Sequence, residues 1–463
     1  MFLRIILPLL AALILPGVTP AADAKKPNIV LILADDLGYE TLGADGGETY
    51  KTPNLDALAA TGMRFDRCYV QPLCTPTRVG LMTGMSNARN YIEFGNMEPN
   101  STTFGNLLHK AGYATAIAGK WQLGHDKDLP QRFGFDESCL WQHTRRPPRY
   151  ANPGLEYNGV ERDFNKGEYG PDLVSDFALK FIDENNSKPF FLYYPMMLTH
   201  APYQPTPDSS DWDPKAQGEK VNHDNKHFAD MVAYMDKLVG KVVTKLDDLK
   251  LRDNTLIIFL GDNGTGKGVN SKLHGVIYPG GKGNTNARGM HVPMLANWPG
   301  HIRPEATNDD LIDSTDFLPT ICAAAEAKIP SNLKIDGHSF WPQLMGEKGQ
   351  PREWIYTWYA QDGVAPIREF VTTKDYKLYR GGRFYDLKQD PFEDNDPKHI
   401  ADLTGEEAKI AAKLKGILAQ FADARPSAVA DKSLSAKKGG GENERPRRAQ
   451  RRARNAARNT SDE

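Results

Sequence analysis

Cysteine is scarce in this chain, with four residues among 463. So low a content excludes a small fold held together by many disulfides. A charge excess of one sign is also lacking, because 57 Lys and Arg against 59 Asp and Glu leave a net charge of -2. A nearly neutral chain is not a wholly basic nucleic-acid binder, so we expect no nucleic-acid partner. A mean hydropathy of -0.54 excludes a protein with many membrane spans.

The near-neutral total hides a basic C-terminal end. Between Lys432 and Arg458 there are ten Lys or Arg and two Glu, a net charge of +8, so the rest of the chain carries -10. Beyond Arg425, Ser, Ala, Gly and Arg dominate and large apolar residues nearly vanish. We therefore expect residues 426–463 to form a disordered basic tail, which either keeps the protein soluble or binds a polyanion.

Long apolar runs are absent near both ends except for Ile5–Val18, which Pro8 and Pro16 interrupt. One positive charge precedes this run, and small residues follow it up to Ala24. This pattern is typical of a secretory signal peptide, here residues 1–24, and the alternative is an uncleaved anchor. We expect an exported protein, periplasmic or secreted, without a transmembrane span.

The body of the chain alternates strand-like and helix-like segments. Short apolar runs of the kind found in strands buried on both faces occur at Asn28–Ala34, Ala114–Ala118, Phe190–Tyr194 and Leu256–Leu260. Helical patterns lie at 53–61, Thr103–Lys110, Asp172–Asn185 and Asp224–Lys250. This alternation predicts an α/β fold for residues 25–340, with a large, mostly parallel sheet sandwiched by helices.

The pattern changes near Phe340. Four short strand-like runs with turns between them follow, at Trp354–Trp358, Glu369–Thr373, Tyr376–Arg380 and Arg383–Leu387. A helical pattern at Glu406–Phe421 comes next. We expect residues 341–425 to form a second domain, a small antiparallel sheet with a packed helix.

Two of the buried strands end in polar pairs. Asp35 and Asp36 follow the first strand, and Asp262 and Asn263 follow the last. In open α/β sheets ligands bind at the carboxyl ends of strands, so these side chains are expected to lie close together. Oxygen ligands favour calcium or magnesium over zinc. The alternative is that both pairs only open turns and cap helices.

A third motif is Cys74-Thr-Pro-Thr-Arg78. Pro76 suits the first turn of a helix, which would place Cys74 at the helix N-terminus, where backbone N–H groups attract an anion. Arg78 lies one turn further on and could pair with that anion or with a carboxylate. The alternative is a buried or disulfide-bonded cysteine. Only Cys68, Cys139 and Cys322 remain besides Cys74, so at most one disulfide could form among those three.

Together these motifs resemble a known family. Asp35-Asp36 after a first strand, C-x-P-x-R about forty residues later, Gly119-Lys-Trp121 and Asp262-Asn-Gly264 are laid out as in the type I, formylglycine-dependent sulfatases. The similarity runs from about Asn28 to Pro299 and continues at Phe384–Pro391. It implies the alkaline-phosphatase-like α/β fold and a secreted sulfuric ester hydrolase of the arylsulfatase type.

The resemblance also implies the parts of the catalytic site. A maturation enzyme would oxidise Cys74 to formylglycine, whose hydrated aldehyde attacks the sulfur of a sulfate monoester and later releases sulfate. Arg78 would anchor the formylglycine. A calcium ion, rather than magnesium, would be held by the four strand-end residues and by residue 74, which are Asp35, Asp36, Asp262, Asn263 and Cys74.

Three further residues match substrate-binding positions of that family. Lys120 in Gly119-Lys-Trp121 and Lys282 in Gly280-Gly-Lys282 match lysines that bind sulfate. His200 in Leu198-Thr-His-Ala-Pro202 matches the histidine that protonates the leaving oxygen. Taken singly, each could be an ordinary solvated lysine or loop histidine. Their order along the chain supports the assignment.

The chain departs from the family pattern at Gln122. The family commonly has histidine there, which helps to break down the sulfated intermediate. Glutamine can hydrogen-bond the diol or the substrate but is no base at pH 7. The familiar E-G-G-x-R-V-P run is also altered, to Ala287-Arg-Gly-Met-His291-Val-Pro293. Both changes put the elimination base in question.

A basic loop with aromatic residues, Trp141–Tyr150, lies where the family shapes its substrate pocket. It could bind an anionic sugar or simply be a solvated loop. Three functions therefore stay open: a sulfatase acting on a carbohydrate, a phosphodiesterase or phosphonate monoester hydrolase with the same sheet, and a weakly active relative that binds sulfated glycans.

Overall fold

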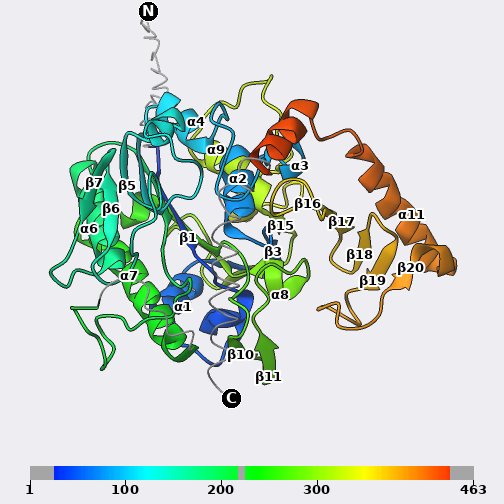
Figure 1. The fold of residues 1–463 in the computed structure, drawn as a ribbon, viewed down its shortest axis with the longest axis horizontal. Helices are drawn as coiled ribbons and strands as arrows, with labels where there is room; N and C mark the ends of the chain where they lie inside the picture. The colour runs from blue at the N-terminus through cyan, green and yellow to red at the C-terminus, as the bar shows by residue number, and fades with distance from the viewer. Residues whose placement is uncertain (1–25, 217–224, 438–463) are drawn as a thin grey trace, which may run out of the picture.

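A computed structural model describes residues 26–216 and 225–437 (Figure 1). The expected signal peptide lies outside these residues, as does most of the expected basic tail. Within the described ranges, no helix combines the length and the apolar character needed to cross a bilayer.

A ten-stranded mixed sheet forms the centre of the molecule. Its strands, in spatial order, are β14 (Ala306–Asn308), β2 (Met63–Phe65), β13 (Met294–Asn297), β9 (Thr255–Gly261), β1 (Asn28–Ala34), β8 (Phe190–Pro195), β4 (Ala114–Lys120), β5 (Glu137–Trp141), β6 (Gly154–Tyr157) and β7 (Val160–Asp163). The five strands from β9 to β5 run parallel, and both flanks add antiparallel pairs. The mostly parallel sheet expected from the sequence is confirmed.

Helices cover both faces of this sheet. Strand β1 shows why, because its apolar side chains alternate between two separate cores. Ile29, Leu31 and Leu33 enter one core with α2 (Cys74–Thr83), α4 (Phe104–Lys110) and α9 (Phe317–Ala324). Val30, Ile32 and Ala34 enter the other core with α1 (Pro53–Ala60), α6 (Gly170–Glu184) and α7 (Phe228–Asp248). A strand buried on both faces must be apolar throughout, as this one is.

Smaller elements complete this domain. A three-stranded sheet contains β12 (His291–Val292), β3 (Cys68–Tyr69) and β15 (Ile312–Asp313), and a hairpin pairs β10 (Asn270–Leu273) with β11 (Val276–Pro279). The short helices are α3 (Asn87–Asn90), α5 (Leu129–Arg132), α8 (Ala287–Met290) and α10 (Trp341–Leu344). The cysteines Cys68, Cys74, Cys139 and Cys322 are all buried and unbridged.

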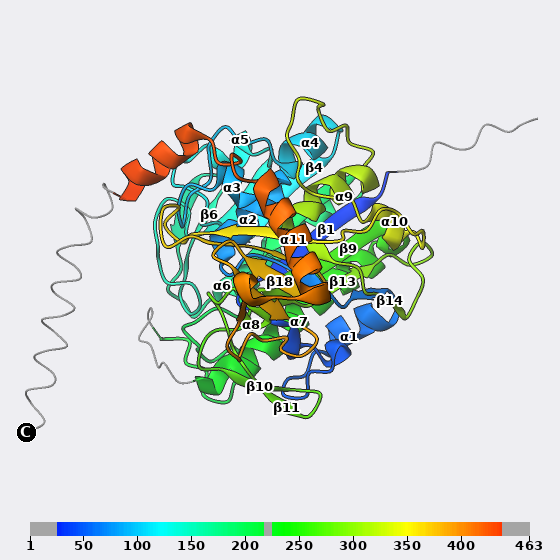
Figure 2. The same ribbon diagram turned by 90° about the vertical axis from the view of Figure 1, so that its right-hand side faces the viewer.

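The C-terminal part forms the expected antiparallel sheet, on the right in Figure 1. Its strands are β16 (Ile355–Tyr359), β17 (Arg368–Thr372), β18 (Tyr376–Tyr379), β19 (Arg383–Asp386) and β20 (Lys398–His399). Helix α11 (Gly405–Gln420) lies across this sheet in Figure 2. Leu414 and Leu418 of α11 share a core with Val371 and Leu378 of the sheet, so the helix covers the apolar face.

The start of the expected tail is ordered, which differs from the sequence-based prediction. Residues 427–437 form a helix. Ser433 is buried and its hydroxyl donates to the carbonyl of Ile92 at 2.7 Å. The Arg425 guanidinium lies 4.3 Å from the centre of the Trp358 ring. The composition did not indicate an ordered segment here because it has no apolar stripe. Its contacts with the rest of the protein include one buried serine, Ser433, and one stacked arginine, Arg425.

Candidate functional site

The site forms where β1 and β9 end side by side. These strands pair in parallel register up to Ala34 and Gly261, so the next residues, Asp35 and Asp262, leave the sheet together. The backbone N–H of Asp36 donates to the Asp262 carboxylate at 3.0 Å. Asp36 has a φ of 62°, in the left-handed region, which turns the chain sharply after the strand. The predicted convergence of the two polar pairs is therefore present in the structure.

Asn263 completes an oxygen-rich cluster. Its Nδ2 donates to Asp36 Oδ1 at 2.9 Å, and its Oδ1 is buried without a hydrogen-bond partner. Ligand atoms of Asp35, Asp36 and His200 lie within 4.8 Å of one another, as do those of Asp35, Cys74 and Asp262. Buried polar atoms are normally satisfied, so the unpaired Oδ1 beside three carboxylates fits a cation site. The oxygen donors suit a hard divalent ion.

Cys74 begins α2 and faces this cluster. The side chain is fully buried, and its thiol donates to Gln122 Oε1 at 2.9 Å. Burial raises the pKa of the Cys74 thiol, although the charges of Lys120 and Lys282 oppose that rise. The thiol is therefore neutral near pH 7 and a poor nucleophile as it stands. Gln122, predicted to lie near the reacting group, contacts it directly.

Arg78 and Lys120 are cations buried beside Cys74. Arg78, one turn along α2, donates to Asp262 Oδ2 at 3.0 Å and to the carbonyl of Lys120 at 2.9 Å. Lys120, the last residue of β4, donates to both carboxylate oxygens of Asp35 at 2.9 Å. Both side chains are about 1% exposed. Each cation has a carboxylate partner, as buried charges require.

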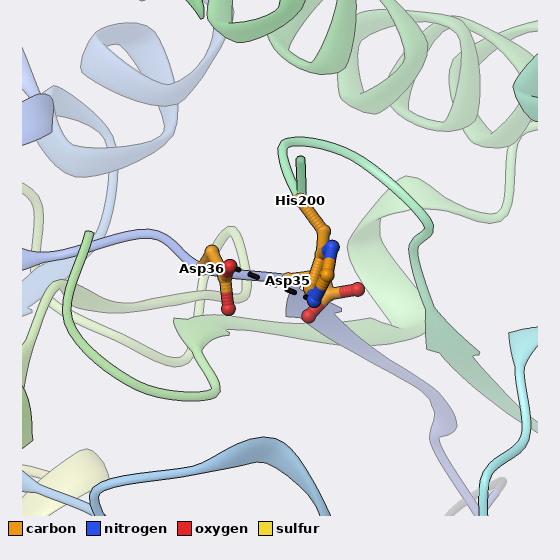
Figure 3. A group of neighbouring side chains, drawn as sticks. All are labelled: Asp35, Asp36 and His200. Carbon is orange, nitrogen blue, oxygen red and sulfur yellow. Dashed lines mark ion pairs between the residues drawn. The ribbon is translucent and has the colours of Figure 1, made fainter. Parts of the chain in front are cut away.

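Lys282 and His200 reach the cluster from two loops. The Lys282 ammonium lies 2.6 Å from Asp36 Oδ1. His200 follows β8, and Figure 3 shows its ring pointing toward Asp35 and Asp36. Its Nε2 lies 3.8 Å from Asp36 Oδ2, and its Nδ1 contacts the carbonyl of Ala201. Burial lowers the pKa of His200 to about 3, against the pull of Asp36.

The pKa values of two carboxylates in the cluster are shifted in opposite directions. Burial alone would raise the pKa of Asp35, but the charges of Lys120, Arg78 and Lys282 hold it well below its usual value. Burial raises the pKa of Asp262 to about 7, and the negative charge of Asp35 adds to that rise. Arg78 and Lys120 offset that rise only in part, whereas Lys120, Arg78 and Lys282 together outweigh the burial of Asp35.

Arg149 is a site residue that sequence reasoning did not single out. It is 2% exposed, and its Nε and Nη1 are buried without hydrogen-bond partners. Nη1 lies 3.8 Å from Asp35 Oδ2, and the guanidinium stacks 3.9 Å from the centre of the Trp141 ring. Both residues belong to the basic, aromatic-bearing loop that the sequence marked as a possible substrate-binding segment. The pattern indicated the loop but not which arginine turns inward.

The neighbouring Tyr150 fixes this loop against the histidine loop. Its hydroxyl donates to the carbonyls of Met197 and His200, at 3.1 and 2.5 Å. The site therefore gathers Arg78, Lys120, Arg149 and Lys282 around three carboxylates and a cysteine at a helix N-terminus. With a divalent cation added, positive charge exceeds negative charge, which suits a small tetrahedral anion.

Comparisons with known proteins identify the same family, the sulfatases. A model described as Sulfatase matches residues 27–327, and one described as N-sulphoglucosamine sulphohydrolase, C-terminal, matches residues 284–423. Bovine arylsulfatase A is 34% identical over 426 residues, covering 80% of this chain and 78% of that protein. Rat N-acetylgalactosamine-6-sulfatase is 33% identical, covering 74% and 70%.

A solved structure has the same fold as this chain. Ps i-CgsB in complex with k-i-k-neocarrahexaose superposes with a TM-score of 0.72 at 28% identity. The match covers 87% of this chain and 94% of that one.

Proposed function

Because the chain belongs to the sulfatase family and is a sulfuric ester hydrolase, we propose that it hydrolyses sulfate monoesters on a carbohydrate with a formylglycine derived from Cys74 and a calcium ion. The observation that carries this proposal is Cys74 at the buried N-terminus of α2, among three carboxylates and four cations. The carbohydrate part is supported by one relative named N-acetylgalactosamine-6-sulfatase and by one solved structure described as a complex with a neocarrahexaose.

Conversion of Cys74 to formylglycine supplies an aldehyde hydrate, which can attack sulfur where the neutral thiol cannot. Gln122 already contacts the side chain at position 74, at 2.9 Å. An amide can donate or accept a hydrogen bond but cannot remove a proton at pH 7. We assign Gln122 to orienting residue 74 and binding substrate. Arg78 anchors the same helix turn through Asp262 and the Lys120 carbonyl.

The donor set fits a calcium ion. Asp35, Asp36, Asp262 and Asn263 would hold it together with residue 74, and the unpaired Oδ1 of Asn263 is an available ligand. A bound dication supplies positive charge that polarises a sulfate oxygen. Both candidate ligand groups among the described residues share Asp35. One shared cluster supports a single-metal sulfatase over a phosphoryl-transfer enzyme with a second metal site.

The cationic side chains bind the sulfate group. Lys120 and Lys282 are held by Asp35 and Asp36, so both ammonium groups are fixed before substrate arrives. Arg149 adds two buried nitrogens, Nε and Nη1, that have no hydrogen-bond partner in the protein. Fixed donors aimed at developing negative charge stabilise a transition state without reorganising.

His200 is placed to protonate the leaving oxygen. A carbonyl only accepts hydrogen bonds, so the contact with the Ala201 carbonyl leaves the proton on Nδ1. Nε2 then faces Asp36 and the reaction space as the unprotonated nitrogen, and it must first take up a proton before it can give one to the leaving oxygen. The Tyr150 hydroxyl fixes the backbone at this position.

Export completes the proposal. Residues 1–24 read as a signal peptide, and the enzyme that forms formylglycine is the partner that maturation requires. The expected destination is the periplasm or the exterior of the cell.

One experiment tests the assignment of Cys74. The protein is produced in a host that matures other sulfatases, and the peptide spanning Cys74 is analysed by mass spectrometry. We expect the thiol to be replaced by an aldehyde and the same sample to release sulfate from an aryl sulfate. An intact thiol together with full sulfate release would contradict the formylglycine proposal, and an aldehyde without sulfate release would contradict sulfatase activity.

Removal of the metal is expected to abolish activity. After dialysis against a chelator, sulfate release should fall at least about 100-fold, because three buried carboxylates then face substrate with less compensating charge. Adding back calcium should restore it. Thermal unfolding gives an independent readout, since calcium at 100 times its Kd stabilises the folded state by about 2.7 kcal/mol. A melting temperature that does not change when calcium is added would disprove the proposed calcium site.

A further inference from the structure

A cavity opens beside the proposed sulfate-binding site. Its volume is about 460 Å³, within the range of about 300–1,000 Å³ usual for small-ligand pockets. Lys282 and the residue before Cys74 form its inner end. The complete lining is Leu73, Lys267, Lys282, Gly283, Tyr359, Gln361, Pro366 and Arg368. A substrate with its sulfate at Cys74 would extend its remaining part into this space.

The outer wall of the cavity comes from the C-terminal sheet. Tyr359 at the end of β16 pairs with Arg368 at the start of β17, and the loop between these strands supplies Gln361 and Pro366. Arg368 Nη1 donates to the carbonyl of Gly283 at 3.1 Å. The N–H of Gly283 in turn donates to the carbonyl of Pro72 at 2.9 Å. These bonds hold the wall against the two segments that carry Lys282 and Cys74.

The cavity wall carries positive charge that no carboxylate balances. Among the described residues, neither Lys267 nor Arg368 lies within 4.0 Å of an acidic side chain. Lys282 differs, because Asp36 neutralises it. The lining contains no Asp or Glu. Two unpaired cations on one wall favour a ligand with negative charge beyond the sulfate that is cleaved.

Tyr359 gives the cavity an apolar surface next to these cations. The side chain is 7% exposed and lines the cavity together with Lys282 and Arg368. An aromatic face beside cations suits a pyranose ring that carries an anion.

We propose that this cavity binds a sugar bearing a second anionic group, a sulfate or a carboxylate, which Arg368 and Lys267 recognise while the first sulfate lies at Cys74. The proposal rests on the sulfatase function proposed above and specifies its substrate class. A doubly anionic sugar satisfies both unpaired cations, whereas a singly sulfated sugar leaves them in water.

Binding to an inactive protein tests this directly. The Cys74→Ala protein is titrated calorimetrically, with calcium present, with N-acetylgalactosamine 6-sulfate, with its 4,6-disulfate, and with a uronosyl disaccharide carrying one 6-sulfate. We expect at least one doubly anionic sugar to bind about 10- to 100-fold more tightly than the monosulfate, because its second anion can make charge-assisted hydrogen bonds that solvent screens only in part. The disulfate and the uronosyl sugar distinguish a second sulfate from a carboxylate.

Variants connect that preference to the cavity wall. Adding Arg368→Ala and Lys267→Ala should remove it, giving similar Kd values for the singly and doubly charged sugars. Arg303→Ala and Lys328→Ala, at exposed positions that do not line this cavity, are the matched controls and should retain it. Equal affinity of the parent protein for all three sugars, or a preference that survives the double substitution, would overturn the proposal.

The two proposals can fail separately. An unsubstituted enzyme that releases no sulfate from any of the three sugars or from an aryl sulfate would count against the proposed function. The binding preference would still be measured on the Cys74→Ala protein, so the substrate class would be decided on its own.

Discussion

Replacement of Cys74 with alanine is expected to lower kcat by about 10⁴-fold or more, equivalent to at least about 5.5 kcal/mol of transition-state stabilisation. The position supplies the nucleophile in the proposed reaction. The hydroxyls described around the site, those of Thr75, Thr77 and Thr199, donate to backbone carbonyls and do not replace it. Gln122, which accepts the Cys74 hydrogen bond, is an amide and cannot attack sulfur. Sulfate release from an aryl sulfate is the measurement.

Cys322→Ala is the matched control. Cys322 is also buried and unbridged, but it packs in α9 within the hydrophobic core. Its replacement should cost about 1 kcal/mol of stability and leave kcat within about twofold. Unfolding curves of both variants show whether lost activity reflects lost folding. More than about 1% residual activity in Cys74→Ala would contradict the proposed nucleophile.

Arg149→Met is expected to lower kcat/KM by about 100- to 1,000-fold, the usual cost of removing one fixed donor from a transition-state anion. Its effect on stability should have the opposite sign. Burying a cation whose N–H groups lack partners is costly, and an apolar side chain of similar length removes that cost. Asp35 keeps Lys120 as its partner, so no carboxylate is left unpaired. The melting temperature should stay constant or rise.

Arg146→Met separates this effect from a general loss of charge. Arg146 lies on the same loop but is exposed, so both readouts should remain near the unsubstituted values. A purely structural Arg149 would behave differently, because its replacement would lower the melting temperature and leave kcat/KM of the folded fraction unchanged. That result would show that Arg149 does not bind the sulfate group.

Much of the fold could be predicted because its strands are buried on both faces. The run Asn28–Ala34 has the same bounds in the sequence pattern and in β1, and α11 differs from its predicted range by one residue at each end. The antiparallel flanks were missed. Strands as short as β2 and β14 carry too few residues to show a period, and their place depends on pairing with distant segments.

The site residues that could be predicted are polar residues that directly follow a buried strand. Asp35 and Asp262 follow apolar strands, so parallel pairing brings them together without further information. Arg149 could not be chosen from its loop, because only the packing against Trp141 decides which arginine turns inward. Arg368 lies some 86 residues after Lys282 in a separate sheet, so sequence spacing could not place it in the same cavity.

The burial of α2 fixes an order of events. Every residue from Cys74 to Thr83 is buried, so a second enzyme cannot reach the Cys74 sulfur once the chain has folded. If a maturation enzyme oxidises Cys74 as proposed, oxidation and folding compete in time, and folding buries whichever side chain is present at position 74. Slower folding, or a longer stay in the unfolded export-competent state, should raise the fraction of active molecules. Under that proposal, the yield of active enzyme depends on the relative rates of oxidation and folding, and protein that folds before oxidation must be unfolded before it can be activated.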